Sequence, residues 1–99
     1  MAFIDLKTLA KREQMPGFHG RFIHAETVTI VRWDVEAGAQ LPEHSHPHEQ
    51  VSNLLVGEFE MTIDGCTKHL QAESVAIVPS NTLHSGRALT NCRFIDIFH

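Results

Sequence analysis

The 99-residue sequence contains no hydrophobic run that approaches the roughly 20 residues needed by a membrane-spanning helix. Its first residues, Met1 to Asp5, lack the basic start and long apolar stretch of a secretory signal peptide. Basic residues are also few, since eight Lys and Arg stand against twelve Asp and Glu. The resulting formal charge of −4 argues against binding to nucleic acid or to an anionic membrane surface. We therefore expect a cytoplasmic protein.

Cysteine is scarce, and the chain has no internal repeat and no low-complexity segment. Cys66 and Cys92 lie far apart without CxxC spacing, which together with the missing secretion signal predicts reduced thiols. A chain of 99 residues that is 42% hydrophobic can form one domain around a single core. We expect an N-terminal arm over residues 1–20 and a β-barrel over residues 21–99.

Helical periodicity is nearly absent from the sequence. Leu6, Leu9 and Ala10 have helical spacing, but Met15-Pro16-Gly17 ends that pattern. Elsewhere, β-forming residues or alternating polar and apolar residues predict strands over residues 27–35, 51–56, 58–63, 66–70, 75–78 and 92–98. Asp64-Gly65 predicts a type I′ hairpin turn. Short strands at this spacing predict an all-β sandwich or small barrel.

The eight histidines are the outlier in this composition, and three of them fall within residues 44–50, His-Ser-His-Pro-His-Glu-Gln. Imidazole is the commonest protein ligand for a transition metal. His44 and His46 share one face if the segment is extended, because side chains two residues apart in a strand point the same way. Pro47 bends the chain, so alternation alone leaves His48, Glu49 and Gln50 open as the next ligand.

His84 lies far down the chain, in a turn that follows Pro79. We interpret this histidine and residues 44–50 as two halves of one metal site. A histidine-rich loop that binds metal only adventitiously is the simpler alternative.

Both segments resemble the paired motifs of the cupin family. Gly38-x5-His44-x-His46-x3-Gln50-x6-Gly57 is similar to the first cupin motif, and Pro79-x-Asn81-x2-His84 is similar to the second. The resemblance implies a double-stranded β-helix, or jelly roll, and the metal ligands His44, His46, Gln50 and His84. Gln50 stands where cupins usually carry Glu. Asn81 replaces the turn glycine, which asparagine can do because it tolerates positive φ.

This ligand set has a chemical consequence. Three neutral imidazoles and an amide oxygen leave the charge of a divalent ion uncancelled, which favours a Lewis acid that polarises a carbonyl or binds a carboxylate. The set lacks the carboxylate of the 2-His-1-carboxylate oxygenases. Zn, Mn, Fe and Ni all accept such ligands, so the sequence does not choose among them. His48 is expected at the pocket rim, as a substrate-binding residue.

One branch of the cupins, the KdgF family, gives a closer resemblance. The similarity lies in His-Ser-His-Pro-His-Glu-Gln-Val-Ser (44–52), in Val-Gly-Glu-Phe-Glu (56–60) and in Asp96-Ile97-Phe98. In that family glutamine is the ordinary fourth ligand, and the enzymes convert 4,5-unsaturated uronates from pectin or alginate to the linear ketonised form. The resemblance implies that Asp96 handles the proton and that Phe98 packs on the sugar ring. The family's downstream arginine would lie beyond residue 99, so either this sequence stops short of it or Arg87 or Arg93 holds the substrate instead.

Other interpretations remain open at this stage. Asp96 and Phe98 can equally be an ordinary strand residue and a core residue. The same pocket would also suit a metal-dependent dioxygenase, or a non-catalytic cupin that binds a sugar or another small ligand. One small barrel leaves sheet edges and apolar strand faces to cover, so we expect a homodimer. Trp33 and the N-terminal arm are candidates for the interface, and Trp33 fits the core equally well.

Overall fold

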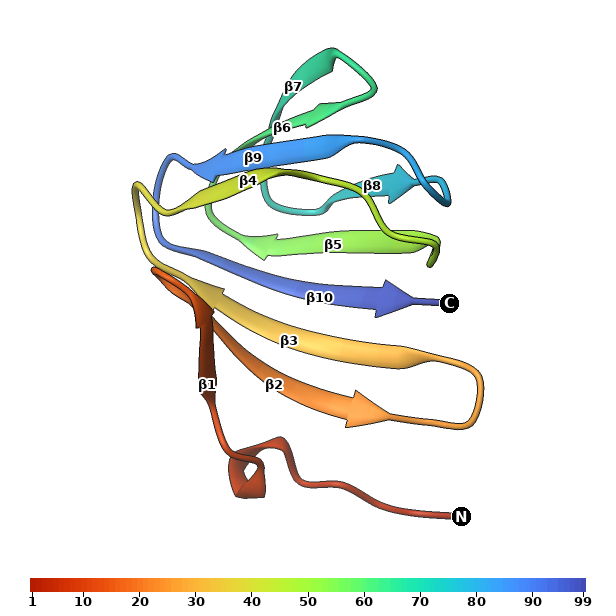
Figure 1. Ribbon diagram of the computed structural model, residues 1–99. Helices are drawn as coiled ribbons and strands as arrows, with labels where there is room; N and C mark the ends of the chain where they lie inside the picture. The colour runs from red at the N-terminus through yellow and green to blue at the C-terminus, as the bar shows by residue number, and fades with distance from the viewer.

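The computed structural model describes residues 1–99 as two antiparallel β-sheets packed face to face (Figure 1). The larger sheet has the strand order β1-β2-β3-β10-β5-β8, and the smaller has the order β4-β9-β6-β7. The all-β jelly-roll fold expected from the sequence is confirmed. The strands are β1 (Arg12–Met15), β2 (Phe18–His24), β3 (Thr29–Val35), β4 (Gln40–His44), β5 (Gln50–Val56), β6 (Phe59–Ile63), β7 (Cys66–Leu70), β8 (Ser74–Val78), β9 (His84–Ala88) and β10 (Cys92–Phe98).

The β-forming and alternating residues located β3, β5, β6, β7, β8 and β10 to within two residues, but β1, β2, β4 and β9 were not among the predicted strands. The boundary expected between an arm ending at residue 20 and a barrel starting at residue 21 is wrong. β1 pairs with β2 and β2 pairs with β3, so both strands belong to the larger sheet and only residues 1–11 precede it. That segment contains the one helical element, the 3-10 helix η1 (Leu6–Thr8), so no helix is long enough to span a membrane.

Two turns have the backbone conformations that their residues predict. Asp64 and Gly65 both have positive φ, 49° and 77°, as the central residues of a type I′ turn require. Asn81 has φ 59°, the left-handed conformation for which a cupin motif would usually supply glycine. Cys66 and Cys92 form no disulfide.

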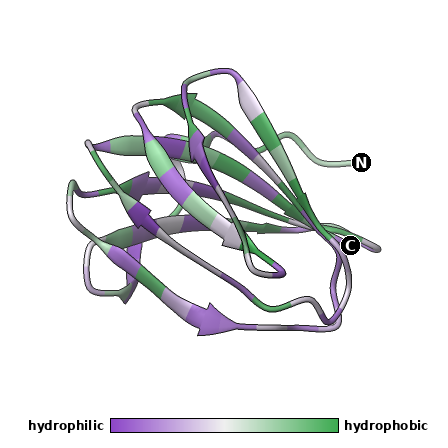
Figure 2. Ribbon diagram, turned by 90° about the horizontal axis from the view of Figure 1, so that it is seen from above, coloured by the Kyte–Doolittle hydropathy of each residue, from purple (hydrophilic) through white to green (hydrophobic).

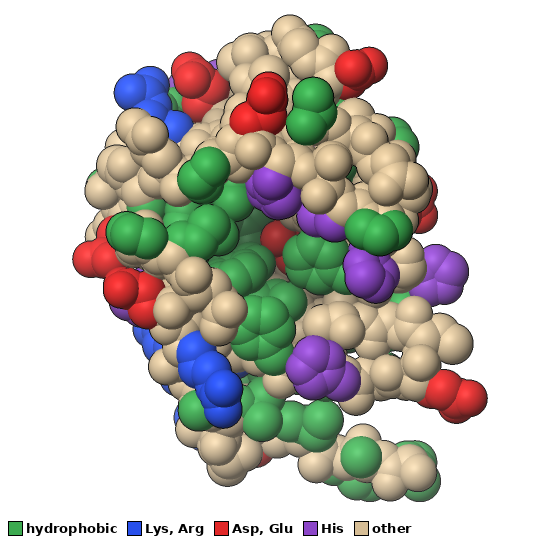
Figure 3. Space-filling model, in the orientation of Figure 1, with side chains coloured by type: hydrophobic (Ala, Val, Ile, Leu, Met, Phe, Trp, Pro, Cys, Tyr) green, Lys and Arg blue, Asp and Glu red, His purple; other side chains and the backbone are tan.

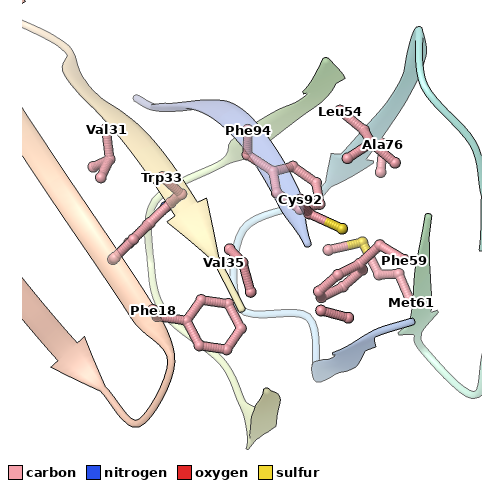
Figure 4. Packing of buried hydrophobic residues seen from close by; sticks show 11 residues of the cluster. Phe18, Val31, Trp33, Val35, Leu54, Phe59, Met61, Ala76, Cys92 and Phe94 are labelled. Atoms are coloured by element: carbon pink, nitrogen blue, oxygen red, sulfur yellow. The ribbon is translucent and has the colours of Figure 1, made fainter. Parts of the chain in front are cut away.

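The core lies between the sheets and is strongly aromatic (Figure 4). Trp33 is 9% exposed and makes edge-on contacts with Phe18 and Phe22, at ring-centroid distances of 6.0 and 5.6 Å. Gly20 lies beneath the indole, where an added Cβ would come within 2.7 Å of Trp33 Cζ3. Trp33 is therefore a core residue, and the glycine provides the space for its ring.

Strand β10 shows how one strand serves both faces of the larger sheet. Phe94 and Asp96 are buried and point inward, whereas Arg93 is exposed and Ile95 is half-buried on the opposite face. The same alternation of hydrophilic and hydrophobic residues is visible along other strands in the view from above (Figure 2). Inward-pointing residues of this sheet supply much of the functional site.

Candidate metal centre

A cavity of about 190 Å³ opens between the two sheets. Figure 3 shows the hollow, with hydrophobic side chains around it, an acidic side chain at its base and histidines along one side. No Lys or Arg lines it; the lining residues are Met15, Phe18, Trp33, Leu41, His44, His46, Gln50, Ser52, Phe59, Met61, Phe94, Asp96 and Phe98. A larger hollow of about 540 Å³ surrounds Lys11 and Arg93 but holds none of the predicted metal ligands.

Three of the predicted ligands come together at one side of this cavity. His44, the last residue of β4, lies opposite His84, the first residue of β9, in the antiparallel register of those strands. His46 follows in the loop after β4. The ring centroids are 4.2 Å apart for His44 and His84, 4.9 Å for His46 and His84, and 5.6 Å for His44 and His46. One nitrogen of each ring lies within 4.8 Å of the others, which confirms the predicted meeting of the two histidine segments.

Hydrogen bonds tie the turn before β9 to the loop that carries His46. The backbone N–H of Asn81 donates to the His46 carbonyl at 2.8 Å, and Ser80 Oγ donates to the Pro47 carbonyl. The positive φ of Asn81 forms part of this turn. The two segments, far apart in sequence, are therefore held in contact by the backbone as well as by the sheet.

In each of the three histidines, Nδ1 forms a hydrogen bond with a backbone carbonyl. His44 donates to Pro42 O at 2.8 Å, His46 to His48 O at 2.9 Å and His84 to Thr82 O at 2.9 Å. With the ring proton on Nδ1, each Nε2 carries a lone pair, which is the arrangement that second-shell carbonyls impose on metal-binding histidines.

The Nε2 of His84 is buried and has no hydrogen-bond partner. Burial lowers the pKa of His84, and the neighbouring His44 and His46 lower it further, although the bond to Thr82 opposes this. The ring is therefore neutral at pH 7. A buried, neutral and unpartnered nitrogen is unfavourable unless a ligand satisfies it, so this atom fits a metal ion.

Gln50 is oriented as a further ligand. Its amide nitrogen donates to Ser52 Oγ at 2.9 Å and to Asp96 Oδ2 at 3.2 Å, so Oε1 faces Nε2 of His46 at 3.0 Å. Because His46 has its proton on Nδ1, two lone pairs face each other across this short distance. A cation relieves that repulsion, and 3.0 Å is close to the separation of adjacent ligands at metal bond lengths of about 2.1 Å. His44, His46, Gln50 and His84 therefore fit one divalent metal ion.

Asp96 lies beside this ligand set, on β10, and is 7% exposed. Its Oδ2 accepts hydrogen bonds from Trp33 Nε1 at 3.1 Å and from Gln50 at 3.2 Å, while its Oδ1 is buried without a partner. Burial raises the pKa of Asp96 to about 7, and hydrogen bonds from Ser52, Trp33 and Gln50 oppose the rise. The cavity thus contains one carboxylate with a free oxygen that exchanges a proton near neutral pH.

Trp33 and Ser52 are the members of this network that the sequence did not reveal as site residues. The alternation of Val31, Trp33 and Val35 placed Trp33 on one strand face, but Asp96 is 63 residues away along the chain. That contact depends on the pairing of β3 with β10.

Phe98, His48 and Glu49 differ in their position relative to the cavity. Phe98 lines the cavity and packs edge-on against His46, with ring centroids 5.6 Å apart. His48 is exposed, and its carbonyl orients His46 while its ring stays outside the cavity lining. Glu49 is exposed, and its backbone pairs with that of His99.

The two arginines proposed to hold substrate do not reach the cavity, so that prediction is wrong. Arg93 lies on the outer face of the larger sheet, where its Nε donates to Asp34 at 3.0 Å. Arg87 lies on the outer face of the smaller sheet, 3.9 Å from Glu60. In each strand the arginine is an odd number of residues from an inward-pointing side chain, Asp96 or His84, and therefore faces the other way.

Several solved structures share this fold. The chain is similar to KdgF from Halomonas sp., with a TM-score of 0.91 and 24% identity over 99% of this chain and 92% of that chain. It is also similar to an RmlC-like cupin from Shewanella frigidimarina, with a TM-score of 0.92 and 26% identity over 99% and 89% of the two chains.

Sequence comparison extends this likeness. The chain is 31% identical over 62 residues to the H2HPP isomerase of Bacillus subtilis, a match that covers 62% of this chain and 26% of that protein. The aligned part is thus about a quarter of that relative's length. The profile of the family described as Cupin domain matches residues 31–98, which include both histidine segments and Asp96. By that match, across more than half of its length, the chain belongs to the cupin family.

Proposed function

We propose that the protein is a metal-dependent enzyme that converts 4,5-unsaturated uronates to their linear ketonised form. The observation that carries this proposal is the free Oδ1 of Asp96, in the cavity that is also lined by His44, His46 and Gln50. Ketonisation moves a proton from an enol oxygen to a carbon, and a carboxylate at that position can transfer it. The relative in B. subtilis is named an isomerase, which supports a reaction of the same general class.

His44, His46, Gln50 and His84 would hold a divalent ion, which when bound would supply a Lewis acid for a substrate oxygen and offset the charge of a carboxylate. This matters because no Lys or Arg lines the cavity. The neutral ligands leave the ion's positive charge available to an acidic substrate.

The surrounding residues define how Asp96 acts. Trp33 and Gln50 both donate to Oδ2, which leaves Oδ1 free to move protons. In ring opening the C1 hydroxyl loses its proton as the bond from C1 to the ring oxygen breaks, and the released ring oxygen takes up a proton to become the enol. Oδ1 then accepts the enol proton and returns it to the substrate carbon as the C=O bond forms. Phe98 and the other hydrophobic lining residues exclude water and offer a surface to the carbon skeleton. A volume of about 190 Å³ is below the roughly 300–1,000 Å³ of drug-sized pockets, so we expect a monomeric sugar acid rather than a polymer.

The direct test is the loss of enol absorbance when protein reconstituted with Zn, Mn, Fe or Ni is mixed with unsaturated galacturonate. The proposal expects faster loss with at least one metal than with the metal-stripped protein or buffer. No acceleration with any of the four metals would reject it. Oxygen uptake by the Fe-loaded protein would instead indicate a dioxygenase, and thermal stabilisation by the sugar without turnover would indicate a binding protein.

A further inference from the structure

Gln50 differs from the histidine ligands in that its end group has two orientations of nearly the same shape. Half a turn about its last side-chain bond exchanges Oε1 with Nε2. Only the oxygen can bind a metal ion, because the NH₂ group is a hydrogen-bond donor without a free lone pair. In the glutamate that cupins usually carry at this position, either carboxylate oxygen can face the ion. A glutamine ligand therefore needs partners that hold its amide in one orientation.

Strand register places two such partners beside the amide. Gln50 and Ser52 are two residues apart on β5, so their side chains point to the same, inward face. Ser52 lies directly opposite Asp96 of β10. The three residues are 4%, 1% and 7% exposed, in that order. Because Gln50 Nε2 donates to Ser52 Oγ at 2.9 Å and to Asp96 Oδ2 at 3.2 Å, both amide hydrogens have an acceptor inside the core.

The hydroxyl of Ser52 can accept or donate, and Asp96 decides which of the two it does toward Gln50. Ser52 donates a hydrogen bond to the Asp96 carboxyl, and this bond opposes the rise in pKa that burial causes. A hydroxyl has a single hydrogen, so Oγ is then only an acceptor for the Gln50 amide. Trp33 Nε1 holds the carboxyl in place by donating to Oδ2 at 3.1 Å. Reversal of the amide would set its oxygen against lone pairs of both Oγ and Oδ2.

One contact favours the reversed orientation, and it lies on the side of His46. Gln50 Oε1 is 3.0 Å from His46 Nε2. After reversal the NH₂ group would take that place and donate to the lone pair of the imidazole. The amide would then offer no oxygen to an ion, and a nitrogen that binds the metal would be occupied. Metal affinity scales with the fraction of molecules in the competent orientation, so the acceptors on the other side matter.

We propose that Ser52 is a positioning residue that makes Gln50 a metal ligand by fixing the orientation of its amide. Ser52 acts through Gln50 and contacts neither the ion nor the substrate. Loss of a residue that orients a metal ligand typically lowers metal affinity by about 10- to 100-fold. The proposal rests on the metal centre and not on the uronate reaction, so metal affinity tests it whether or not the protein converts unsaturated galacturonate.

The test is the affinity for Zn²⁺, measured by competition with a chelator in a double-mutant cycle. Ser52→Ala should bind Zn²⁺ about 10- to 100-fold more weakly than wild type. In the Gln50→Glu background the same change should cost less than about threefold, because a carboxylate needs no orienting partner. Asn53→Ala is the matched control. Asn53 follows Ser52 on β5 but points to the opposite face, where it donates to the Ile95 carbonyl at 3.1 Å, so this variant should keep wild-type affinity.

Hydrogen exchange of the Gln50 side chain in the wild-type protein, followed by NMR, gives a second measurement if Ser52→Ala fails to fold. Its NH₂ group should exchange at least about 10-fold more slowly than those of the exposed Gln14, Gln40 and Gln71, because both of its hydrogens are bonded in a buried site. Exchange as fast as in the exposed glutamines would overturn the proposal.

Two outcomes of the double-mutant cycle would also overturn it. One is a Zn²⁺ affinity of Ser52→Ala within about threefold of wild type. The other is an equal loss with and without Gln50→Glu, which would show that Ser52 contributes packing and not orientation. Wild-type affinity together with no turnover would reject the uronate reaction and leave the role of Ser52 to be decided by the cycle alone.

Discussion

Asp34 and Asp96 lie on adjacent strands of one sheet but on opposite faces of it. Their surroundings shift the pKa values of the two carboxyl groups in opposite directions. Partial burial alone would raise the pKa of Asp34, but hydrogen bonds and charge from Lys11 and Arg93, at 2.9 and 3.0 Å, outweigh it and lower the pKa. Asp96 has neutral donors around it, so burial dominates and raises its pKa to about 7.

The contrast separates a structural carboxylate from a reactive one. An ion-paired carboxylate on the outer face stays charged and takes part in surface salt bridges. A carboxylate surrounded by the neutral donors Trp33, Gln50 and Ser52 keeps both protonation states accessible near neutral pH. The same change, aspartate to asparagine, should therefore have different consequences on the two faces.

The largest expected difference is in catalysis. Asp96→Asn should lower kcat on unsaturated galacturonate by about 10²–10⁴-fold, because it removes the group that transfers the proton. Metal content, measured by elemental analysis, should be unchanged. Asp34→Asn is the matched control and should keep kcat within about twofold of wild type. Equal losses in the two variants would remove the distinction between the faces.

A second difference should be seen in the stability of the metal-free protein. The folded-state pKa of Asp96 is above the unfolded value of 3.8, so the folded state binds more protons between about pH 4 and 7. Asp96 therefore stabilises the fold fully below pH 3.8, and this stability is lost as the pH rises through about 7. The change is at most about 4 kcal/mol. Urea unfolding from pH 4.5 to 8 should show a smaller decline in Asp96→Asn, whereas parallel curves would contradict the raised pKa.

The smallest effect belongs to Asp34, with the opposite sign. Its folded-state pKa lies below 3.8, so its ion pairs stabilise the protein above that pH and are lost as the pH falls through the folded value. Because the site is partly exposed, we expect less than about 1 kcal/mol. Urea unfolding between pH 2.5 and 5 should show a shallower acid-side loss in Asp34→Asn. High salt should reduce the wild-type effect, and an effect insensitive to salt would contradict this account.

Sequence reasoning succeeded where one short segment determines the outcome. Asp64-Gly65 fixes its hairpin through backbone preference, and His44, His46 and His84 each lie at a position that a local motif defines. It failed for β1 because Arg12–Met15 is mostly exposed and has no alternating pattern to detect.

The misplaced arginines show a different kind of error. Arg93 was predicted to share a pocket with Asp96, although they are three residues apart in one strand and must face opposite ways. The alternation of side chains along a strand was sufficient to exclude Arg93 from the pocket that contains Asp96. The bond from Trp33 to Asp96, by contrast, depends on which strands pair, and alternation does not specify pairing.

The central claim is that two distant histidine segments bind one metal ion, and elemental analysis of purified protein tests it most directly. Wild type should contain about one divalent ion per chain, and His84→Ala should contain almost none, because it removes the buried Nε2 that has no other partner. His69→Ala, at an exposed histidine on β7 paired with Glu58, should keep the wild-type content. Wild-type metal content in His84→Ala would contradict the account.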